Sequence, residues 1–416
     1  MTQPPPMHSL LDANGRPILG LFEQTPARVN WRDADYRSPL GRRHGRLRRR
    51  LAYKQFEYFG IVAPDLFAGC ALADLGWVGA AFMYVYVPST GAMESISIRR
   101  PLGRGLHLTH QPVTGHSHLH CRRATAHLRY SAAGRALQVE TRSGLEIDAS
   151  FAEGPDHCQP MSLCTQTARN GWVYARKIAG TRVYGQVTGA GVTRDLGEIG
   201  AFAHHDYSAG FMRRETFWNW ACFSAQVGDR RLGLNVSCGV NETGFSENCL
   251  WLDGARIAIG PTHFDFRRDD LTAPWTVRSA CGALDLEFVP CGRHTERLNA
   301  GLIASDFRQD FGFFSGRLQP PGHDAIEITQ CVDVHADVPV GVVRFSRHAC
   351  QRLVIRGVIN HAFTPDLQGE ISQFHHLSVF LIQQGDIGDV IEVVAQINPV
   401  FNKAVVVTRN HDHREG

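Results

Sequence analysis

The sequence predicts an all-β protein, and three observations predict it. Short runs rich in Val, Tyr, Phe and Trp recur from residue 53 onward, for example GWVGAAFMYVYV at 76–87, RALQVET at 135–141 and GLEIDASF at 144–151. Turn signals containing glycine separate them at about 8–12-residue spacing, which is typical of antiparallel barrels and sandwiches. Long helical periodicity is nearly absent, so we expect few and short helices.

The turns are specific enough to predict hairpins. Asp253-Gly254 is a two-residue loop of the kind that a type I′ turn requires, because both residue types tolerate a positive φ. Gly228-Asp229 has the same length, and the Gly189–Gly191 and Ala132–Gly134 segments are further candidates. We therefore expect the strands that flank these dipeptides to pair directly with each other.

Composition limits the classes of function. The chain has 416 residues, 43% hydrophobic content and a net charge of +3. This small net charge does not by itself favour binding to nucleic acid. The N-terminus lacks the basic and apolar regions of a signal peptide, and no window of about 18 apolar residues predicts a membrane span. Eleven cysteines without a CxxC pair are typical of reduced, half-buried residues, although the pairing of Cys158 with Cys164 stays open. We expect a cytoplasmic protein.

The chain divides by composition. The basic run GRRHGRLRRR is either an anion or nucleic-acid patch or a solvated lead-in; we favour the lead-in, because no aromatic residues interleave the arginines. A Gly/Pro-containing break near 155–168 separates two β units, SDFRQDFG at 305–312 predicts a short helix, and 378–397 is ambiguous between strands and a helix. The predicted parts are an Arg/Pro-rich lead-in at 1–50, an N-terminal barrel at 51–165, a C-terminal barrel carrying the pocket at 166–360, and a divergent tail at 361–416.

A hairpin of residues 215–227 and 230–239 predicts a ligand pocket. If Gly228-Asp229 closes it, directly opposed residues have numbers that sum to 457, so Trp220 faces Ser237 and Trp218 faces Gly239. One face then mixes large aromatic with small and polar side chains, which is typical of a ligand site, although tryptophans that fill a core are the alternative. That face carries Trp218, Trp220, Cys222, Asn235 and Ser237, and the opposite, apolar face contains Asn219 as its one polar residue.

Candidate catalytic residues precede this hairpin in HHDYSAGFMRR at 204–214. Asp206 or Tyr207 is a candidate acid or base if burial shifts its pKa, and Arg213 or Arg214 is a candidate for holding a carboxylate or an oxyanion. The alternative is an ion pair between Asp206 and an arginine at the rim of a barrel. Glu247 and Asn248 add a carboxylate and an amide at the start of the next strand.

The histidines His116, His118 and His120 alternate, so in a strand they share one face, a spacing that suits zinc or iron. No carboxylate nearby completes a ligand set, and we favour solvated histidines and predict no metal. No P-loop, nucleophile elbow or dinucleotide motif is present. We therefore expect no redox or nucleotide cofactor.

Several stretches resemble a bacterial family of unknown function, numbered 2804. They cover much of residues 30–355 and are KQFEYFGIVAPDLFAGCALADLGWVGAAFMYVY, WVYARKIAG, RRETFWNWA, GLNVSCGVNETGFSENCLWLDG, FDFRRDDLTAPWTVRS and SDFRQDFGFFSG. That family is similar to the superfamily of carotenoid 1,2-hydratases and attachment proteins. The resemblance implies two packed lipocalin-like (calycin) antiparallel β-barrels.

The resemblance also implies a site. In the hydratases, Asp-His-x-Trp-Gly precedes Trp-Asp-Trp; here Asp206-Tyr207-Ser208-Ala209-Gly210 precedes Trp218-Asn219-Trp220. The first Asp, the Gly and both Trp match, whereas the His, the other Trp and the second Asp are replaced. The implied function is hydratase-, cyclase- or isomerase-type acid–base chemistry on a largely apolar small molecule, with a non-catalytic lipid or isoprenoid carrier as the alternative.

Overall fold

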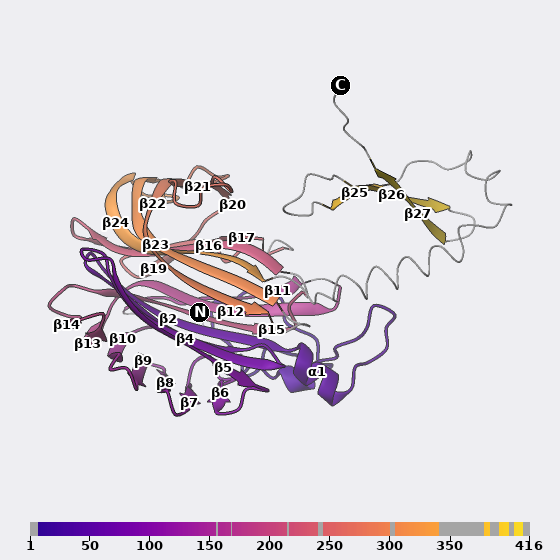
Figure 1. The fold of residues 1–416 in the computed structure, drawn as a ribbon, viewed down its shortest axis with the longest axis horizontal. Coiled ribbons are helices and arrows are strands. Elements are labelled where there is room, and N and C mark those ends of the chain that lie inside the picture. The colour runs from indigo at the N-terminus through magenta and orange to yellow at the C-terminus, as the bar shows by residue number, and fades with distance from the viewer. Residues whose placement is uncertain are drawn as a thin grey trace, which may run out of the picture. The chain divides into compact units, whose positions relative to one another are not determined.

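The protein is an all-β molecule of packed antiparallel sheets, which confirms the predicted fold class (Figure 1). The computed structural model describes residues 7–154, 157–167, 169–213, 216–239, 244–299, 304–340, 378–382, 391–398 and 403–410. Met1–Arg344 form one compact unit and Phe345–Gly416 a second.

The central sheet of the first unit has eight strands in the order β1-β11-β12-β15-β2-β3-β4-β5. Strands β2, β3, β4 and β12 are almost continuously buried, as expected for strands that are covered on both faces. Their bounds are β1 Gly20–Leu21, β2 Lys54–Ala63, β3 Leu66–Asp74, β4 Val78–Val87, β5 Ala92–Pro101, β11 Met161–Thr167, β12 Gly171–Arg182 and β15 Phe202–Gly210.

A seven-stranded sheet in the order β14-β13-β10-β9-β8-β7-β6 covers one face of the central sheet (Figure 1). Its strands alternate buried with exposed residues, because their outer face is in water. Their bounds are β6 Leu106–His107, β7 Gly115–His120, β8 Ala124–Ser131, β9 Gly134–Thr141, β10 Glu146–Ala152, β13 Tyr184–Gly189 and β14 Val192–Asp195.

A nine-stranded sheet in the order β19-β18-β17-β16-β24-β23-β22-β21-β20 covers the opposite face, so that the central sheet lies between the other two (Figure 1). Its strands are β16 Thr216–Val227, β17 Arg230–Cys238, β18 Cys249–Leu252, β19 Ala255–Ala258, β20 Thr262–Asp265, β21 Trp275–Ser279, β22 Leu284–Asn299, β23 Ala304–Leu318 and β24 Ile326–Val340. The second unit contains a three-stranded sheet of β25 Ser378–Ile382, β26 Ile391–Asn398 and β27 Lys403–Asn410, so the described part of the ambiguous 378–397 stretch is strand.

Two hydrophobic cores hold the first unit together. One joins the central sheet to both neighbours and includes Phe59, Tyr174 and Trp220. The other lies within the nine-stranded sheet and includes Phe223 and Trp275. Because neighbouring residues of a strand point to opposite faces, β16 contributes to both cores.

The turn predictions are confirmed and one helix prediction is wrong. Asp253 and Gly254 both have positive φ, and the two residues Gly228-Asp229 join β16 to β17. The predicted helix at 305–312 lies within β23, which pairs with strands on both sides. Tertiary pairing overrides the local pattern there. Helical structure in the described residues is limited to the helix α1, Arg46–Ala52, and a 3₁₀ turn at Trp31–Asp33.

The predicted boundary near 155–168 lies between β10 and β11, which belong to different sheets. β15 pairs with β2, β12 with β15 and β11 with β12, so these three later strands extend the sheet that the N-terminal strands begin. The division of the chain into two barrels at that point stays a prediction. No helix in the described residues is long and apolar enough to cross a membrane.

Candidate functional site

A buried group of three charged side chains lies between the central and nine-stranded sheets. Lys177 and Asp206 are directly paired residues of β12 and β15, so their side chains are neighbours on one face. The Nζ atom of Lys177 lies 3.1 Å from Oδ2 of Asp206 and 2.7 Å from Oε1 of Glu247. We call Asp206, Lys177 and Glu247 the charge cluster.

Burial and mutual attraction oppose each other in the charge cluster. Burial alone would lower the pKa of Lys177, but the two carboxylates outweigh it and the pKa is raised. Burial raises the pKa of Asp206, and Lys177 only partly offsets this effect. Ser208 Oγ donates a hydrogen bond to Asp206 Oδ1 at 2.8 Å. Lys177 is therefore an ammonium, and Asp206 is a carboxyl that holds its proton to higher pH than an exposed aspartate.

The predicted hairpin brings Trp220 and Asn235 to this cluster. The register is confirmed, since Trp220 pairs with Ser237 and Asn219 with Cys238. Trp220 Nε1 donates to Asn235 Oδ1 at 2.7 Å, and Lys177 Nζ lies 5.5 Å from the centroid of the Trp220 ring. One face of this indole is thus already occupied by a cation.

This arrangement differs from the expected pocket inside the C-terminal barrel. Trp220 and Cys222 belong to the core shared with the central sheet, and Trp218 packs against it. On the other face of β16, Ala221 and Phe223 belong to the core within the nine-stranded sheet. The predicted ligand face of β16 is therefore turned towards the central sheet.

Backbone contacts fix the segment that carries Glu247. Asn235 Nδ2 donates to the carbonyl oxygen of Glu247 at 3.0 Å, and the Ser237 amide donates to Asn248 Oδ1 at 2.7 Å. Asn248 Nδ2 in turn donates to Thr262 Oγ1 at 3.1 Å. The polar residues predicted as ligand contacts thus hold the Glu247 segment against β17.

Other predicted residues lie elsewhere. Tyr207 points to the opposite face of β15 from Asp206 and donates from its hydroxyl to the Thr109 carbonyl oxygen at 2.9 Å. Asn219 is buried and points away from Trp220, since the two are adjacent in β16. Arg213 is exposed between β15 and β16, and Arg214 lies outside the described residues. The alternative of a rim ion pair with an arginine is corrected, because Asp206 pairs with Lys177 and lies within β15.

His204 adds a neutral, unpartnered imidazole beside the cluster. It pairs with Gly60 in β2, and a Cβ at that glycine would lie 2.2 Å from the His204 ring, so only glycine leaves room for it. Its ring centroid lies 5.4 Å from that of Tyr58 and 6.0 Å from that of Trp220. Both ring nitrogens are buried without a hydrogen-bond partner, and burial lowers the pKa of His204 to about 3. This imidazole is therefore neutral at pH 7.

Part of the site reaches the surface. Asp206, Ser208 and Trp218 are each partly exposed, whereas Lys177, Glu247 and Trp220 are buried. The Asp206 carboxyl and the Trp218 ring are therefore the parts of the site that solvent reaches.

Sequence reasoning missed Lys177, His204 and Ser208. Lys177 carried a usable signal, because it is one of only three lysines and lies within a buried strand, WVYARKIAG. His204 and Ser208 follow from the Asp206 face, since alternate residues of β15 share it. The pairing of β15 with β12, which brings Lys177 to this face, was not deducible from the local sequence pattern.

The alternating histidines form an exposed cluster on the outer face of the seven-stranded sheet. His118 pairs with His107 and with His127 across β6, β7 and β8, and His116 Nε2 lies 2.9 Å from His127 Nδ1. His120 ends β7. Across the residues the structure describes, no group of three or more His, Cys, Asp or Glu side chains is arranged to hold a metal ion.

Comparison with known proteins gives the family. The model of a domain of unknown function, DUF2804, matches residues 3–338, and the chain belongs to this family. Among curated protein sequences, none matches the chain.

Solved structures give two distant similarities. A protein assigned as AttH from Nitrosomonas europaea has 10% identity and a TM-score of 0.43 over 70% of this chain and 93% of its own. Kievitone hydratase from Nectria haematococca has 8% identity and a TM-score of 0.43 over 70% of this chain and 89% of its own.

Proposed function

We propose that the protein is a cofactor-independent, cytoplasmic enzyme that transfers a proton to or from a largely apolar small molecule at Asp206. The observation that carries the proposal is the charge cluster itself: two carboxylates and an ammonium are buried beside indole and imidazole rings. Buried acid–base groups with perturbed pKa values are enriched at catalytic centres.

We assign each residue a role. Asp206 is the proton donor or acceptor, because its raised pKa brings it closer to neutral pH than an exposed aspartate. Lys177 stabilises negative charge on Asp206 or on a reacting oxygen, and Glu247 holds the ammonium in place. Trp218 provides the accessible apolar surface for the substrate. Hydration, cyclisation and isomerisation all require such a proton transfer.

A carrier of a lipid or isoprenoid is the second candidate, and one observation favours it. Lys177 lies within ion-pair distance of both carboxylates, so the ammonium has its partners without a substrate. Such a cluster also serves a purely structural role under a binding surface. A carrier needs Trp218 but has no need of the Asp206 proton.

Native mass spectrometry of freshly purified protein, followed by organic extraction, identifies any bound molecule. That molecule is then incubated with wild-type protein, with Asp206→Asn and with Asp195→Asn, whose carboxylate lies at the exposed end of β14. Conversion by wild type and Asp195→Asn but not by Asp206→Asn supports the enzyme. Retention of the molecule by all three proteins without conversion supports the carrier. Equal conversion by wild type and Asp206→Asn contradicts the role of Asp206.

A further inference from the structure

One end of the central sheet gathers four connections that are distant in sequence. Across the sheet, Val173 pairs with Gly210, and Gly210 with Lys54. Gly79 pairs with both Asp74 and Arg100 further along the same end. The β11–β12 turn, helix α1, the β3–β4 turn and the segment after β5 therefore lie together at this end, which we call the basic end.

Large apolar side chains protrude from the basic end. Leu40, Leu47 and Leu102 are the three most exposed large hydrophobic residues in the described part of the chain, at 97%, 74% and 62%. Trp77 is 49% exposed, and its carbonyl oxygen accepts a hydrogen bond from the Leu102 amide at 2.8 Å. The loop that carries Leu40 is held to the β11–β12 turn by Arg169, which donates to the Pro39 carbonyl oxygen. Protruding leucines and a tryptophan at one end are unusual for a surface that faces only water.

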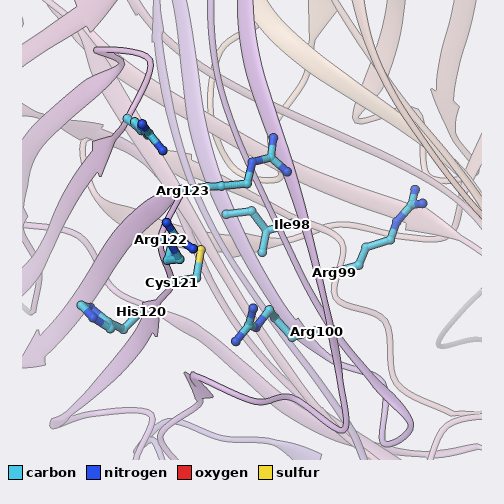
Figure 2. Close-up of a pocket in the computed structure, with 8 residues that line it drawn as sticks. Ile98, Arg99, Arg100, His120, Cys121, Arg122 and Arg123 are labelled. Carbon is cyan, nitrogen blue, oxygen red and sulfur yellow. The ribbon is translucent and has the colours of Figure 1, made fainter.

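An arginine-lined depression of about 700 Å³ adjoins these residues. It is joined to the segment after β5, because the His120 amide donates to the Gly105 carbonyl oxygen at 2.7 Å. In the view of Figure 2, Ile98 lies between the side chains of Arg123 and Arg100, and Arg99 turns away from them. The lining residues are Ile98, Arg99, Arg100, His120, Cys121, Arg122, Arg123 and Arg142.

Most of this positive charge has no carboxylate partner. Arg99 pairs with Glu296 at 3.6 Å, whereas Arg100 and Arg123 donate only to backbone carbonyl oxygens. Within the described ranges, the side chains of Arg122 and Arg142 have no hydrogen bond or ion pair. Their guanidinium groups are therefore available for phosphate oxygens, which arginine binds in a bidentate manner.

We propose that the basic end docks on a lipid bilayer with anionic headgroups. Exposed Trp and Leu side chains beside arginines are the features of a surface that lies in the membrane interface, where apolar tips enter and cations bind headgroups. A site for a free phosphate compound needs the arginines but not the protruding Leu102 and Trp77. This proposal does not depend on the chemistry of the charge cluster.

The test is sedimentation of the full chain with vesicles of phosphatidylcholine, with and without 30 mol% phosphatidylglycerol, on the order of physiological salt. We expect binding to the anionic vesicles only. Each arginine near an anionic surface contributes roughly five-fold, so Arg122→Gln/Arg142→Gln is expected to weaken binding by about 25-fold. Arg122→Gln alone removes one charge, and Arg268→Gln is its matched control, since this exposed arginine lies between β20 and β21 of another sheet.

Tryptophan fluorescence tests the apolar contact separately. Trp77 is the most exposed of the seven tryptophans, all of which lie in the described residues; Trp218 is partly exposed and the other five are buried. Brominated lipids in the anionic vesicles are expected to quench wild-type fluorescence and to leave Trp77→Phe, which still binds, unquenched.

Three outcomes overturn the proposal. The first is no binding to anionic vesicles, or equal weakening by Arg268→Gln, which indicates diffuse attraction. The second is quenching that persists in Trp77→Phe. The third is a thermal shift with inorganic pyrophosphate alone and no vesicle binding, which assigns the depression to a free phosphate compound.

Discussion

Lys177 and Glu247 form a buried ion pair across 70 residues of sequence, with Nζ and Oε1 2.7 Å apart. Lys177 belongs to the central sheet and Glu247 to the segment before β18 of the nine-stranded sheet. The pair therefore ties two sheets together at the candidate site. Its neighbour Asp206 supplies the second carboxylate, so the ammonium balances one of two negative charges.

Replacing Lys177 with methionine is expected to destabilise the protein by about 3–5 kcal/mol. Methionine matches the length of the stem, but Asp206 and Glu247 are then buried without a compensating cation. Urea unfolding at pH 7 measures the loss. The triple variant Lys177→Met/Asp206→Asn/Glu247→Gln is the control, because it removes all three charges together. If the triple variant is no more stable than Lys177→Met, uncompensated charge is not the cause of the loss.

Two glycines allow β12 and β17 to approach closely enough for this contact. A Cβ on Gly233 would lie 2.5 Å from the Ala179 carbonyl carbon, and one on Gly180 would lie 2.8 Å from the Gly233 amide nitrogen. Both obstacles are backbone atoms, which cannot rotate away. The glycines therefore set the spacing of the two sheets at the site.

Gly233→Ala is accordingly expected to cost roughly 1–3 kcal/mol of unfolding free energy by overpacking. Urea unfolding measures this cost. Gly45→Ala is the matched control, because a Cβ there meets no atom within 4 Å and φ is −67°. A loss in Gly45→Ala as large as that in Gly233→Ala contradicts the steric explanation.

Local pattern predicted the β16–β17 hairpin well, because turn length fixes register and register fixes which residues share a face. Trp220 and Asn235 were placed together on that basis, and the structure joins them by a hydrogen bond. The pairing of Lys177 with Asp206 beside this hairpin was not deducible, because the two residues come from β12 and β15 of another sheet. Sheet-to-sheet packing depends on close approaches such as that of Gly233 to Gly180, which leave no periodic signal in the sequence.

The alternation of side chains along a strand explains why the predicted helix at 305–312 was wrong. The segment has polar residues at spacings compatible with a helix, but in β23 Gln309 and Phe311 point to one face and are buried. Gln309 Nε2 donates to the Tyr58 hydroxyl at 2.8 Å, a contact 251 residues away in sequence. A buried polar side chain whose partner is that distant looks like a surface residue in a local window.

Adjacent aromatic residues of β16 provide a matched test of the ligand face. Trp218 packs against the core beside the charge cluster, whereas Phe217 is exposed on the opposite face. We expect Trp218→Ala to lose the co-purified apolar molecule in native mass spectrometry and Phe217→Ala to retain it. The two variants remove similar aromatic area one residue apart, so a general effect on the strand would affect both. Loss in Phe217→Ala alone would place the ligand on the other face.

A second buried acid gives a prediction for pH. Glu57 lies on the face of β2 opposite Tyr58, where Gln55 Nε2 and the Tyr130 hydroxyl donate to its carboxyl oxygens at 2.7 and 2.6 Å. Burial raises the pKa of Glu57 to about 7, only partly offset by these hydrogen bonds. This acid is not part of the charge cluster, so its titration reports on the fold rather than on the candidate site.

Because the folded protein holds this proton more tightly than the unfolded chain, the stabilisation is fully present below about pH 4.5, the ordinary value, and is lost as pH rises through about 7. The change is on the order of 3 kcal/mol. Glu57→Gln cannot titrate, so the difference in unfolding free energy between it and wild type should move by this amount from pH 4.5 to 7.5, with the variant gaining relative to wild type. His110, whose pKa burial lowers to about 4, titrates in both proteins and cancels in the difference. A difference that stays constant across this range would show that Glu57 keeps an ordinary pKa despite its burial.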